Sequence, residues 1–218
     1  SKLGKKYFEE FEGEILEELK KAGVIKSDKL MLDATVAPSH IEYPNDVKLM
    51  NVAREWICKT ILEVKNKINP KLKVRTYRRK ARALFLDFQK KKKKSKRLIE
   101  KSKKKMSSYL RRNIEQVVKL ISEYEKLPLD IFHRLPIKII NKHVQTAKEI
   151  YQQQMKMIRE KTRRVSNRIV SFHQPQVRPI LRGKEGKGVE FGPKELLAYV
   201  DGYAFLDKIS FDNFNEGI

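Results

Sequence analysis

The sequence predicts a mixed α and β chain of the α+β class, in which a long helical region separates strands near the two ends. Apolar residues recur at helical spacing through the middle of the chain. Short apolar runs near both ends are typical of strands, and a two-residue turn typical of β-hairpins joins the last two runs. Because 40% of the 218 residues are hydrophobic, the chain can bury a core of its own.

The N-terminal part is predicted to hold one helix and one strand. Apolar side chains repeat every three or four residues over 7–22, and Gly23 follows where a glycine commonly ends a helix. Residues 29–36 form a short apolar run interrupted by one carboxylate, that of Asp33, and Pro38 follows the run. This pattern predicts a buried strand that carries Asp33 near its end.

Helices are predicted through the middle of the chain. Asn45 and Asp46 make a good helix start, and Pro70 ends the apolar face that follows. The lysine run at 90–94 is low in complexity, and we expect it to be ordered only in part. Helices are further expected on either side of that run, around Leu84 and Phe88 and around Leu98 and Ile99, and over 109–124 and 137–158.

After about Arg164 the pattern changes to short strands separated by glycine and proline turns. Strands are predicted over 168–172, 189–200 and 203–211. Asp201 and Gly202 both tolerate a positive φ, so they predict a tight hairpin between the last two strands. The predicted organisation is therefore an N-terminal helix over 1–28, a first strand over 29–44, a helical region over 45–165 that is strongly basic at 71–112, and second and third strands over 166–218.

Positive charge is concentrated in residues 71–112, which we call the basic block. The chain holds 50 Lys and Arg against 27 Asp and Glu, a formal net charge of +23. The basic block has twenty Lys or Arg and two acidic residues, so it contributes +18 of that total. Such an excess favours a polyanion as partner, with nucleic acid first and a membrane surface second. The alternative is a solvated helical face or a disordered linker.

Other functions are disfavoured. No run approaches the roughly 20 apolar residues of a spanning helix, and the N-terminus shows no signal-peptide pattern, so we expect a soluble, intracellular protein without a membrane partner. Cys58 lies in an apolar helical pattern and is predicted to be a core thiol. No metal is assigned to the histidines, because they are scattered and lack ligand spacing; they are His40, His133, His143 and His173. Three tyrosines at helical spacing are placed in the core instead of in a base-stacking site; they are Tyr77, Tyr109 and Tyr151.

Three groups of motifs are similar to those of the bacterial insertion-sequence transposases with a DDE active site on a ribonuclease H-like fold. The first group is LDATVAP (32–38), IEYPND (41–46) and NVARE (51–55). The second is RTYRRKAR (75–82) with YQQQM (151–155). The third is RIVS (168–171), QP (174–175), VRPI (177–180), RGK (182–184), VEFG (189–192) and NE (215–216), so the resemblance covers nearly the whole chain.

The resemblance implies an incomplete ribonuclease H-like domain of three antiparallel strands with a long basic α-helical insertion. It implies that Asp33 is the first of three carboxylates that hold two Mg²⁺ or Mn²⁺ ions for DNA strand cleavage and transfer by phosphoryl transfer. We do not find the family's second Asp, its Glu or its N-terminal DNA-binding segment. Asp201 is explained by its hairpin turn, and Asp207, Asp212 and Glu216 are not promoted to the missing carboxylates. We therefore expect a fragment truncated at both ends, inactive by itself.

Arginines are the predicted contacts to DNA phosphates near the active site, because a guanidinium can bind two phosphate oxygens at once. The residues assigned to nucleic-acid binding are Arg75, Arg78, Arg79, Arg178, Arg182 and Lys184. The resemblance implies double-stranded DNA at transposon ends as the partner and a bacterial cytoplasmic, nucleoid-associated location, and it leaves a homodimer open for the full-length enzyme. The alternative is a non-catalytic DNA- or RNA-binding relic in which Asp33 has no chemical role.

Overall fold

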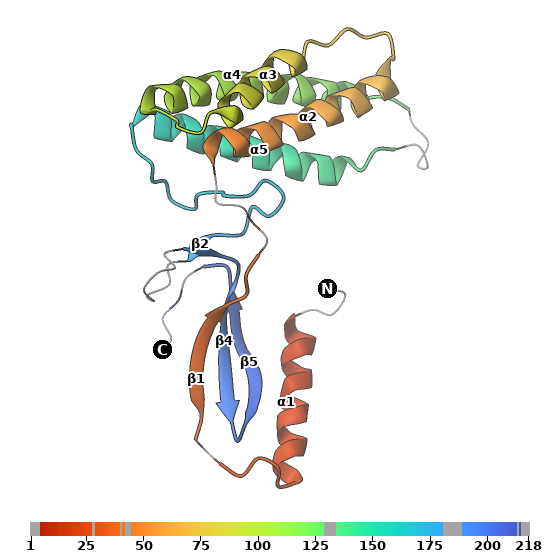
Figure 1. Ribbon diagram of the computed structural model, residues 1–218. Coiled ribbons are helices and arrows are strands. Elements are labelled where there is room, and N and C mark those ends of the chain that lie inside the picture. Colours follow the sequence, from red (N-terminus) through yellow and green to blue (C-terminus); the bar gives the residue numbers. More distant parts are fainter. Residues whose placement is uncertain are drawn as a thin grey trace. The chain divides into compact units, whose positions relative to one another are not determined.

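A computed structural model describes residues 5–27, 29–39, 41, 45–128, 134–180, 189–212 and 214. It divides the chain into two compact units (Figure 1). We call residues 41–176 the helical unit and the combination of residues 1–40 and 177–218 the sheet unit. With five helices and a three-stranded antiparallel sheet among the described residues, the chain is a mixed α and β protein, as the sequence predicts.

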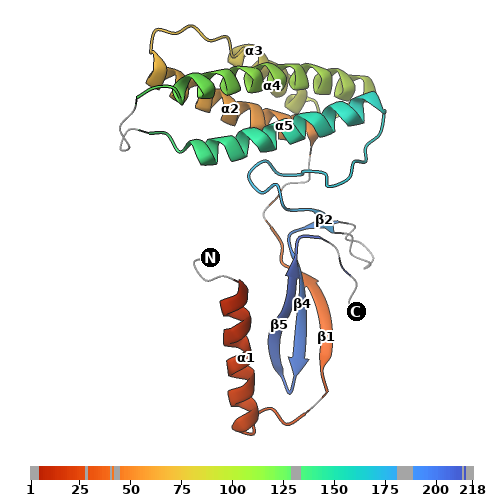
Figure 2. The same cartoon turned by 180° about the vertical axis from the view of Figure 1, so that it is seen from behind.

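The sheet unit is built on three antiparallel strands, β1 (Met31–Val36), β4 (Lys194–Val200) and β5 (Tyr203–Ser210), in the order β1-β4-β5 (Figure 2). The predicted hairpin is confirmed, because Asp201 (φ 47°) and Gly202 (φ 85°) connect β4 to β5. The register shifts by one residue between Leu196 and Leu197, which leaves Asp207 of β5 without a partner on β4. The shift is a β-bulge, and such a bulge bends the strand that contains it.

A second, two-stranded ribbon pairs β2 (Pro179–Ile180) with β3 (Glu190–Phe191). The predicted strand over 189–200 is therefore split into β3 and β4 by Gly192 and Pro193. The Pro193 carbonyl accepts a hydrogen bond from Ala37 N–H at 3.0 Å, so the link between the two strands lies against the chain that leaves β1.

The N-terminal helix α1 (Lys5–Lys21) ends with Gly23 in a left-handed conformation (φ 67°), as predicted. Two contacts join this region to the hairpin strands. Glu12 Oε1 accepts a hydrogen bond from Leu206 N–H at 3.2 Å. The carboxylate of Asp201 accepts hydrogen bonds from the N–H groups of Lys26 and Ser27, at 2.7 and 2.8 Å.

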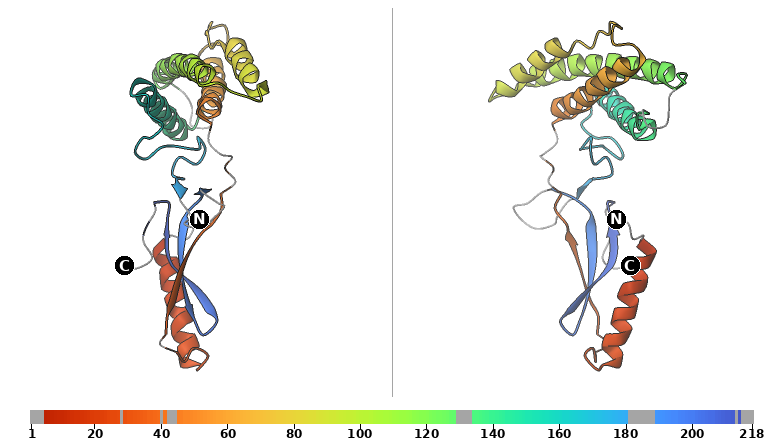
Figure 3. Two further views of the ribbon diagram at one scale, coloured as in Figure 1. Left: turned by 60° about the vertical axis from the view of Figure 1, so that its left-hand side comes forward. Right: turned by 90° about the vertical axis from the view of Figure 1, so that its right-hand side faces the viewer.

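The helical unit contains α2 (Asp46–Ile68), α3 (Arg78–Lys90), α4 (Lys96–Tyr124) and α5 (Ile137–Arg159), which pack around one core (Figure 3). The predicted start of α2 is confirmed, because Asn45 Oδ1 accepts hydrogen bonds from Val47 and Lys48 N–H. Ser95 caps α4 in the same way, so the lysine run lies across the end of α3 and a short connection. Fully buried core side chains include Met50, Ile57, Ile61, Met106, Leu110 and Val117.

The strand expected over 168–172 is wrong. These residues form no strand, and Ile169 and Phe172 are buried against the helices. The N–H of Ile169 donates to Gln153 Oε1 on α5 at 3.0 Å. The Gln153 side chain thus satisfies the Ile169 N–H, which would otherwise pair with a neighbouring strand. Helices, and not a sheet, cover the apolar side chains of Ile169 and Phe172.

Candidate nucleic-acid interface and metal-binding carboxylate

Asp33 lies on β1 directly across from Leu197 of β4, and its side chain is exposed. The expectation of a buried strand is therefore wrong at this end, since the residues of β1 become buried only toward Val36. Thr35, two positions along β1, faces the same side of the sheet as Asp33 and is paired with Glu195. Glu195 is thus a second carboxylate on the face of Asp33, on the diagonal between paired strands. Sequence reasoning did not select it, because only the strand register brings it there.

No group of three or more His, Cys, Asp or Glu side chains that could hold a metal ion occurs in the part of the chain that the structure describes. His143 instead stacks on Trp56, with ring centroids 4.7 Å apart, and both rings contact Phe172. His40 and His133 lie outside the described residues, as does Glu216. The strand register thus places two carboxylates, those of Asp33 and Glu195, on one face of the sheet.

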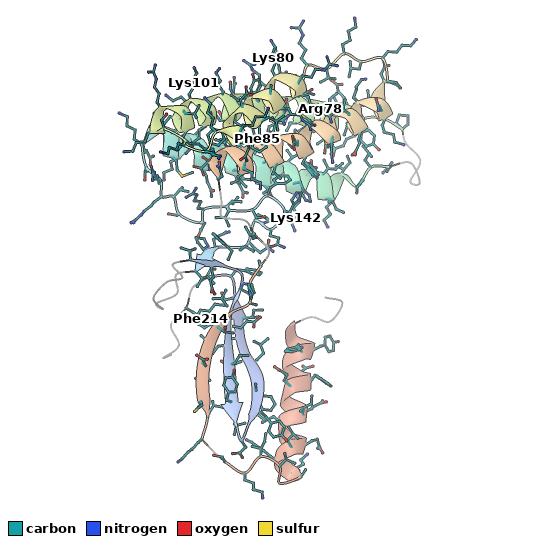
Figure 4. The ribbon with its side chains drawn as sticks, viewed as in Figure 1. Arg78, Lys80, Phe85, Lys101, Lys142 and Phe214 are labelled. Carbon is teal, nitrogen blue, oxygen red and sulfur yellow. The ribbon has the colours of Figure 1, made fainter. Side chains whose placement is uncertain are left out.

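The basic block begins in the segment before α3 and extends through α3 into the first half of α4. On α4 its exposed cations recur at intervals that place them on one face of the helix. We call this set the α4 basic stripe; it consists of Arg97, Lys101, Lys104, Lys105, Arg111 and Arg112. Its ends, Arg97 and Arg112, are fifteen positions apart, a length of about 22 Å at 1.5 Å per residue. In Figure 4, Lys80 of α3 and Lys101 of α4 lie along the same edge of the helical unit.

Few carboxylates neutralise this charge. Among the described residues, the ion pairs made by the basic block are Lys103 with Asp46 at 2.8 Å and Arg111 with Glu115 at 3.0 Å. Lys103 points inward with only 11% of its side chain exposed, so it belongs to the core and not to the stripe. The cations of the stripe consequently face solvent largely without counter-charges from the protein.

The predicted nucleic-acid-binding residues divide between the two units. Arg75, Arg78 and Arg79 are exposed and lie in the helical unit. Arg178 is half-buried just before β2 in the sheet unit, where one of its Nη atoms donates to the Val177 carbonyl at 3.2 Å. Arg182 and Lys184 lie outside the described residues. The three described arginines of the helical unit therefore form one group, and Arg178 belongs to the unit of Asp33.

Asp46 makes the most extensive polar contacts in the helical unit. Its carboxylate accepts from Lys103 at 2.8 Å, from Arg168 at 2.6 Å and from Gln154 at 2.8 Å. Burial alone would raise the pKa of Asp46, but the Lys103 hydrogen bond and the charges of Lys103 and Arg168 outweigh it and lower the pKa. The network joins α2, α4, α5 and the segment after α5, and sequence reasoning missed it because its members are far apart in the chain.

Cys58 is buried, as predicted, within a polar cluster between α2 and α4. Its sulfur accepts from Asn113 Nδ2 at 2.9 Å and from Arg54 Nη1 at 3.7 Å. Arg54 is fully buried and also donates to Asn51 Oδ1 at 2.8 Å. Burial raises the pKa of the Cys58 thiol, so this cysteine is held in its neutral, unreactive form.

The interpretation of Tyr77 as a core residue is wrong. Tyr77 immediately precedes α3, has a left-handed backbone (φ 52°) and is 36% exposed. The Arg112 guanidinium lies over its ring at 5.3 Å, and the Tyr109 ring is 6.2 Å away. Tyr151, by contrast, packs against the core as predicted. The helical spacing that favoured the core does not apply to Tyr77, because it lies outside the helix.

Comparison with family models, curated proteins and solved structures finds no match to this chain. None of the helices in the described part of the chain combines the length and the apolar composition needed to cross a bilayer.

Proposed function

We propose that this chain is part of a DDE transposase, with a helical unit that contacts DNA phosphates and a sheet unit that carries one carboxylate of the metal site. The observation that supports DNA binding most directly is the α4 basic stripe. It presents six cations on one face over about 22 Å of a rigid helix. Duplex DNA carries one phosphate per roughly 1.7 Å of its axis, so a stripe of this length meets several phosphates at once.

Support for a ribonuclease H-like sheet comes from strand order. The family resemblance implies three consecutive antiparallel strands with a helical insertion after the first. The order β1-β4-β5, with the helical unit between β1 and β4 in the sequence, agrees with that arrangement. Asp33 on the first of these strands would contribute to a site for two Mg²⁺ or Mn²⁺ ions, whose oxygen ligands are carboxylates. The remaining carboxylates of that site are not assigned to residues of this chain.

The site's residues fit a divalent cation only in part. Asp33 would supply an oxygen ligand, with Glu195 beside it on the same sheet face, and bound ions would stabilise the charge that develops in phosphoryl transfer. In this proposal Asp33 holds a cation, whereas the cations of the helical unit position the DNA. We further propose a cytoplasmic, nucleoid-associated location in a bacterium, because DNA is the substrate, and we leave the oligomeric state open.

DNA binding is tested by fluorescence anisotropy with labelled duplexes over a salt series. Each phosphate contact that a variant loses should reduce the slope of log affinity against log salt by about 0.9. The variant replaces Arg97, Lys101, Lys104 and Lys105 of the stripe by Gln. We expect its slope to fall by roughly 2 to 4 relative to the wild type.

The matched control removes the same charge elsewhere on the helical unit. Its substitutions to Gln are at Lys119, Lys126, Lys138 and Lys142, all of them exposed. We expect the slope to change by less than about 1, because these positions lie outside the stripe. Equal losses in both variants would exclude the stripe as the interface, and no duplex binding by the wild type at low salt would overturn the proposed function.

The second candidate function is a non-catalytic DNA- or RNA-binding protein. Asp33 is exposed opposite Leu197, and the described residues include no group of three side chains that could hold a metal ion. Both observations favour this candidate. In that case the duplex-binding results are unchanged. A chain extended by any residues that follow in the gene would then show no metal-dependent cleavage, whereas the transposase proposal requires cleavage that depends on Asp33.

A further inference from the structure

Residues 71–77, the segment between α2 and α3, alternate strictly between exposed and partly buried side chains. Leu72 and Val74 pack against the core of the helical unit. The intervening residues are all exposed; they are Lys71, Lys73, Arg75 and Tyr77. Alternation of this kind is the pattern of an extended chain with one face on a core, so the three cations and the tyrosine share the outer face. Within residues 72–76, between the turn at Lys71 and the left-handed backbone at Tyr77, successive exposed residues of such a chain lie about 6.6 Å apart.

The segment is held in place by α4. Gln116 Nε2 donates to the Arg75 carbonyl at 2.9 Å across 41 positions of sequence. Arg112, four residues earlier on α4, lies over the Tyr77 ring, and Tyr109 flanks the same ring. The outer face of the segment is therefore fixed against a rigid helix before any ligand binds, which reduces the entropy lost on binding.

Tyr77 occupies a backbone conformation that disfavours its side chain. A non-glycine residue at φ 52° is strained, because its Cβ approaches backbone oxygen, and strained residues of this kind cluster at functional sites. A glycine or asparagine would satisfy the same backbone at lower cost. Glycine or asparagine would not supply the aromatic ring of Tyr77. This residue is 36% exposed, and the Arg112 guanidinium lies over its ring.

We propose that residues 71–77, together with Arg112, bind single-stranded nucleic acid, with an unpaired base stacked on Tyr77. The proposal rests on the proposed function in that the helical unit binds nucleic acid. A row of cations that follows a phosphate backbone and ends at an exposed aromatic ring is the combination used by proteins that bind single strands. The α4 basic stripe has no exposed aromatic ring of its own and contacts duplex phosphates. The Tyr77 face adjoins it through Arg112, which belongs to both, and selects unpaired nucleotides.

The experiment compares the full chain and its variants with a labelled oligothymidylate, an abasic oligonucleotide of equal length, an oligouridylate and a duplex. Stacking of one base on an aromatic side chain corresponds to about 5-fold to 100-fold in affinity. We expect Tyr77→Leu and Tyr77→Gly to lose this factor for oligothymidylate and to bind the abasic strand and the duplex within about 2-fold of the wild type. Tyr77→Phe keeps the ring and retains the wild-type affinity.

Tyr77→Gly keeps the test decisive, because glycine favours the left-handed backbone and a loss of binding cannot then be attributed to misfolding. The control is Tyr203→Leu, which removes a tyrosine of similar exposure (41%) from β5 and should change no affinity. Equal losses for oligothymidylate, abasic strand and duplex, or no loss for any of them, would overturn the inference. If the inference is overturned in this way but the wild type binds duplex DNA, the proposed function still stands. If the wild type binds no nucleic acid, both the inference and the proposed function are rejected.

The oligouridylate separates the two sources of an unpaired base. Affinity for oligothymidylate and oligouridylate that falls equally in Tyr77→Gly supports a site that accepts any single strand, because every base offers a π face. A loss for oligouridylate that exceeds the loss for oligothymidylate supports the same stacking site with RNA as its preferred ligand, through contacts to the 2′-hydroxyl.

Discussion

The carboxylate of Asp46 and the guanidinium of Arg168 form an ion pair of 2.6 Å between residues 122 positions apart in the chain. Asp46 lies in the first turn of α2, and Arg168 lies in the segment that follows α5. Lys103 of α4 meets the same carboxylate at 2.8 Å. One acidic group therefore pairs with two partly buried cations, and it fixes the segment after α5 against the helices that carry the basic block.

Replacement of Asp46 by Asn is expected to destabilise the helical unit by about 2 to 3 kcal/mol, because Lys103 and Arg168 would remain partly buried without a counter-charge. Urea unfolding monitored by the fluorescence of Trp56 measures the change. The control is Glu115→Gln, which breaks the exposed pair with Arg111 and should cost less than about 0.5 kcal/mol. Equal effects of the two substitutions would show that the Asp46 network contributes no more than a surface pair.

The lowered pKa values of Asp46 and Asp201 predict that stability falls at acid pH. A carboxylate whose pKa is lower in the folded state binds its proton more readily in the unfolded state. Its contribution to stability is therefore present above the unfolded pKa and is lost as the pH falls from about 5 through the lowered folded pKa. The free energy of unfolding, measured between pH 3 and 7, should decline over the acid part of this range. The decline should be shallower in Asp46→Asn, and an identical slope would contradict the assignment.

Several elements of the fold were predictable because their determinants are local. Asn45, Gly23 and the Asp201-Gly202 turn each act on neighbouring backbone groups, so the sequence identifies them directly. The strand expected at 168–172 was wrong because its apolar residues pack on helices that are distant in the sequence.

The candidate site was less predictable than the fold. The charge of the basic block was evident from composition. The members of the α4 basic stripe could be identified only from the structure, which shows where α4 runs and that Lys103 points inward. The position of Glu195 beside Asp33 depends on strand register. The exposure of Tyr77 depends on where α3 begins, and a helix boundary is the feature that sequence patterns locate least well.

Gly192 is predicted to tolerate no side chain. Its φ is 156°, and a Cβ at this position would lie 1.9 Å from the Ala37 carbonyl oxygen and 3.2 Å from Ser39 N. These atoms are backbone and cannot rotate away, so Gly192→Ala should destabilise the sheet unit by about 2 to 4 kcal/mol. Thermal unfolding followed by circular dichroism measures the loss. Gly13→Ala is the control, since no atom lies within 4 Å of its added Cβ and alanine favours the helix, and a similar loss in both variants would refute the steric argument.

Asp201 is expected to protect two amides that are distant in sequence. Its carboxylate accepts from the N–H groups of Lys26 and Ser27, so Asp201→Ala should increase hydrogen exchange at these amides by about 5-fold or more, with little change in the helical unit. Exchange is followed by NMR at residue resolution. Asp207→Ala removes an exposed carboxylate at the nearby bulge and should leave both amides unchanged. Unchanged exchange in Asp201→Ala would show that other contacts protect the loop.

The proposed role of Asp33 predicts binding without cleavage in the chain of 218 residues. Asp33 is the one carboxylate that the proposal assigns here, and one carboxylate does not hold two divalent ions against phosphate oxygens. Supercoiled plasmid incubated with the chain and Mg²⁺ or Mn²⁺ should therefore remain intact. Asp33→Ala should bind duplex DNA like the wild type, since its side chain is exposed on β1 and the proposed phosphate contacts lie in the helical unit.

Metal-dependent nicking by the wild type would contradict this prediction if it were lost in Asp33→Ala and kept in Asp212→Asn, because the chain would then contain a complete site. Glu195→Gln extends the test to the carboxylate that shares the face of Asp33. If nicking were lost in Glu195→Gln as well, the two carboxylates on that sheet face would form the metal site together. Nicking that survives both substitutions would instead come from a contaminating nuclease, and the prediction for the chain itself would stand.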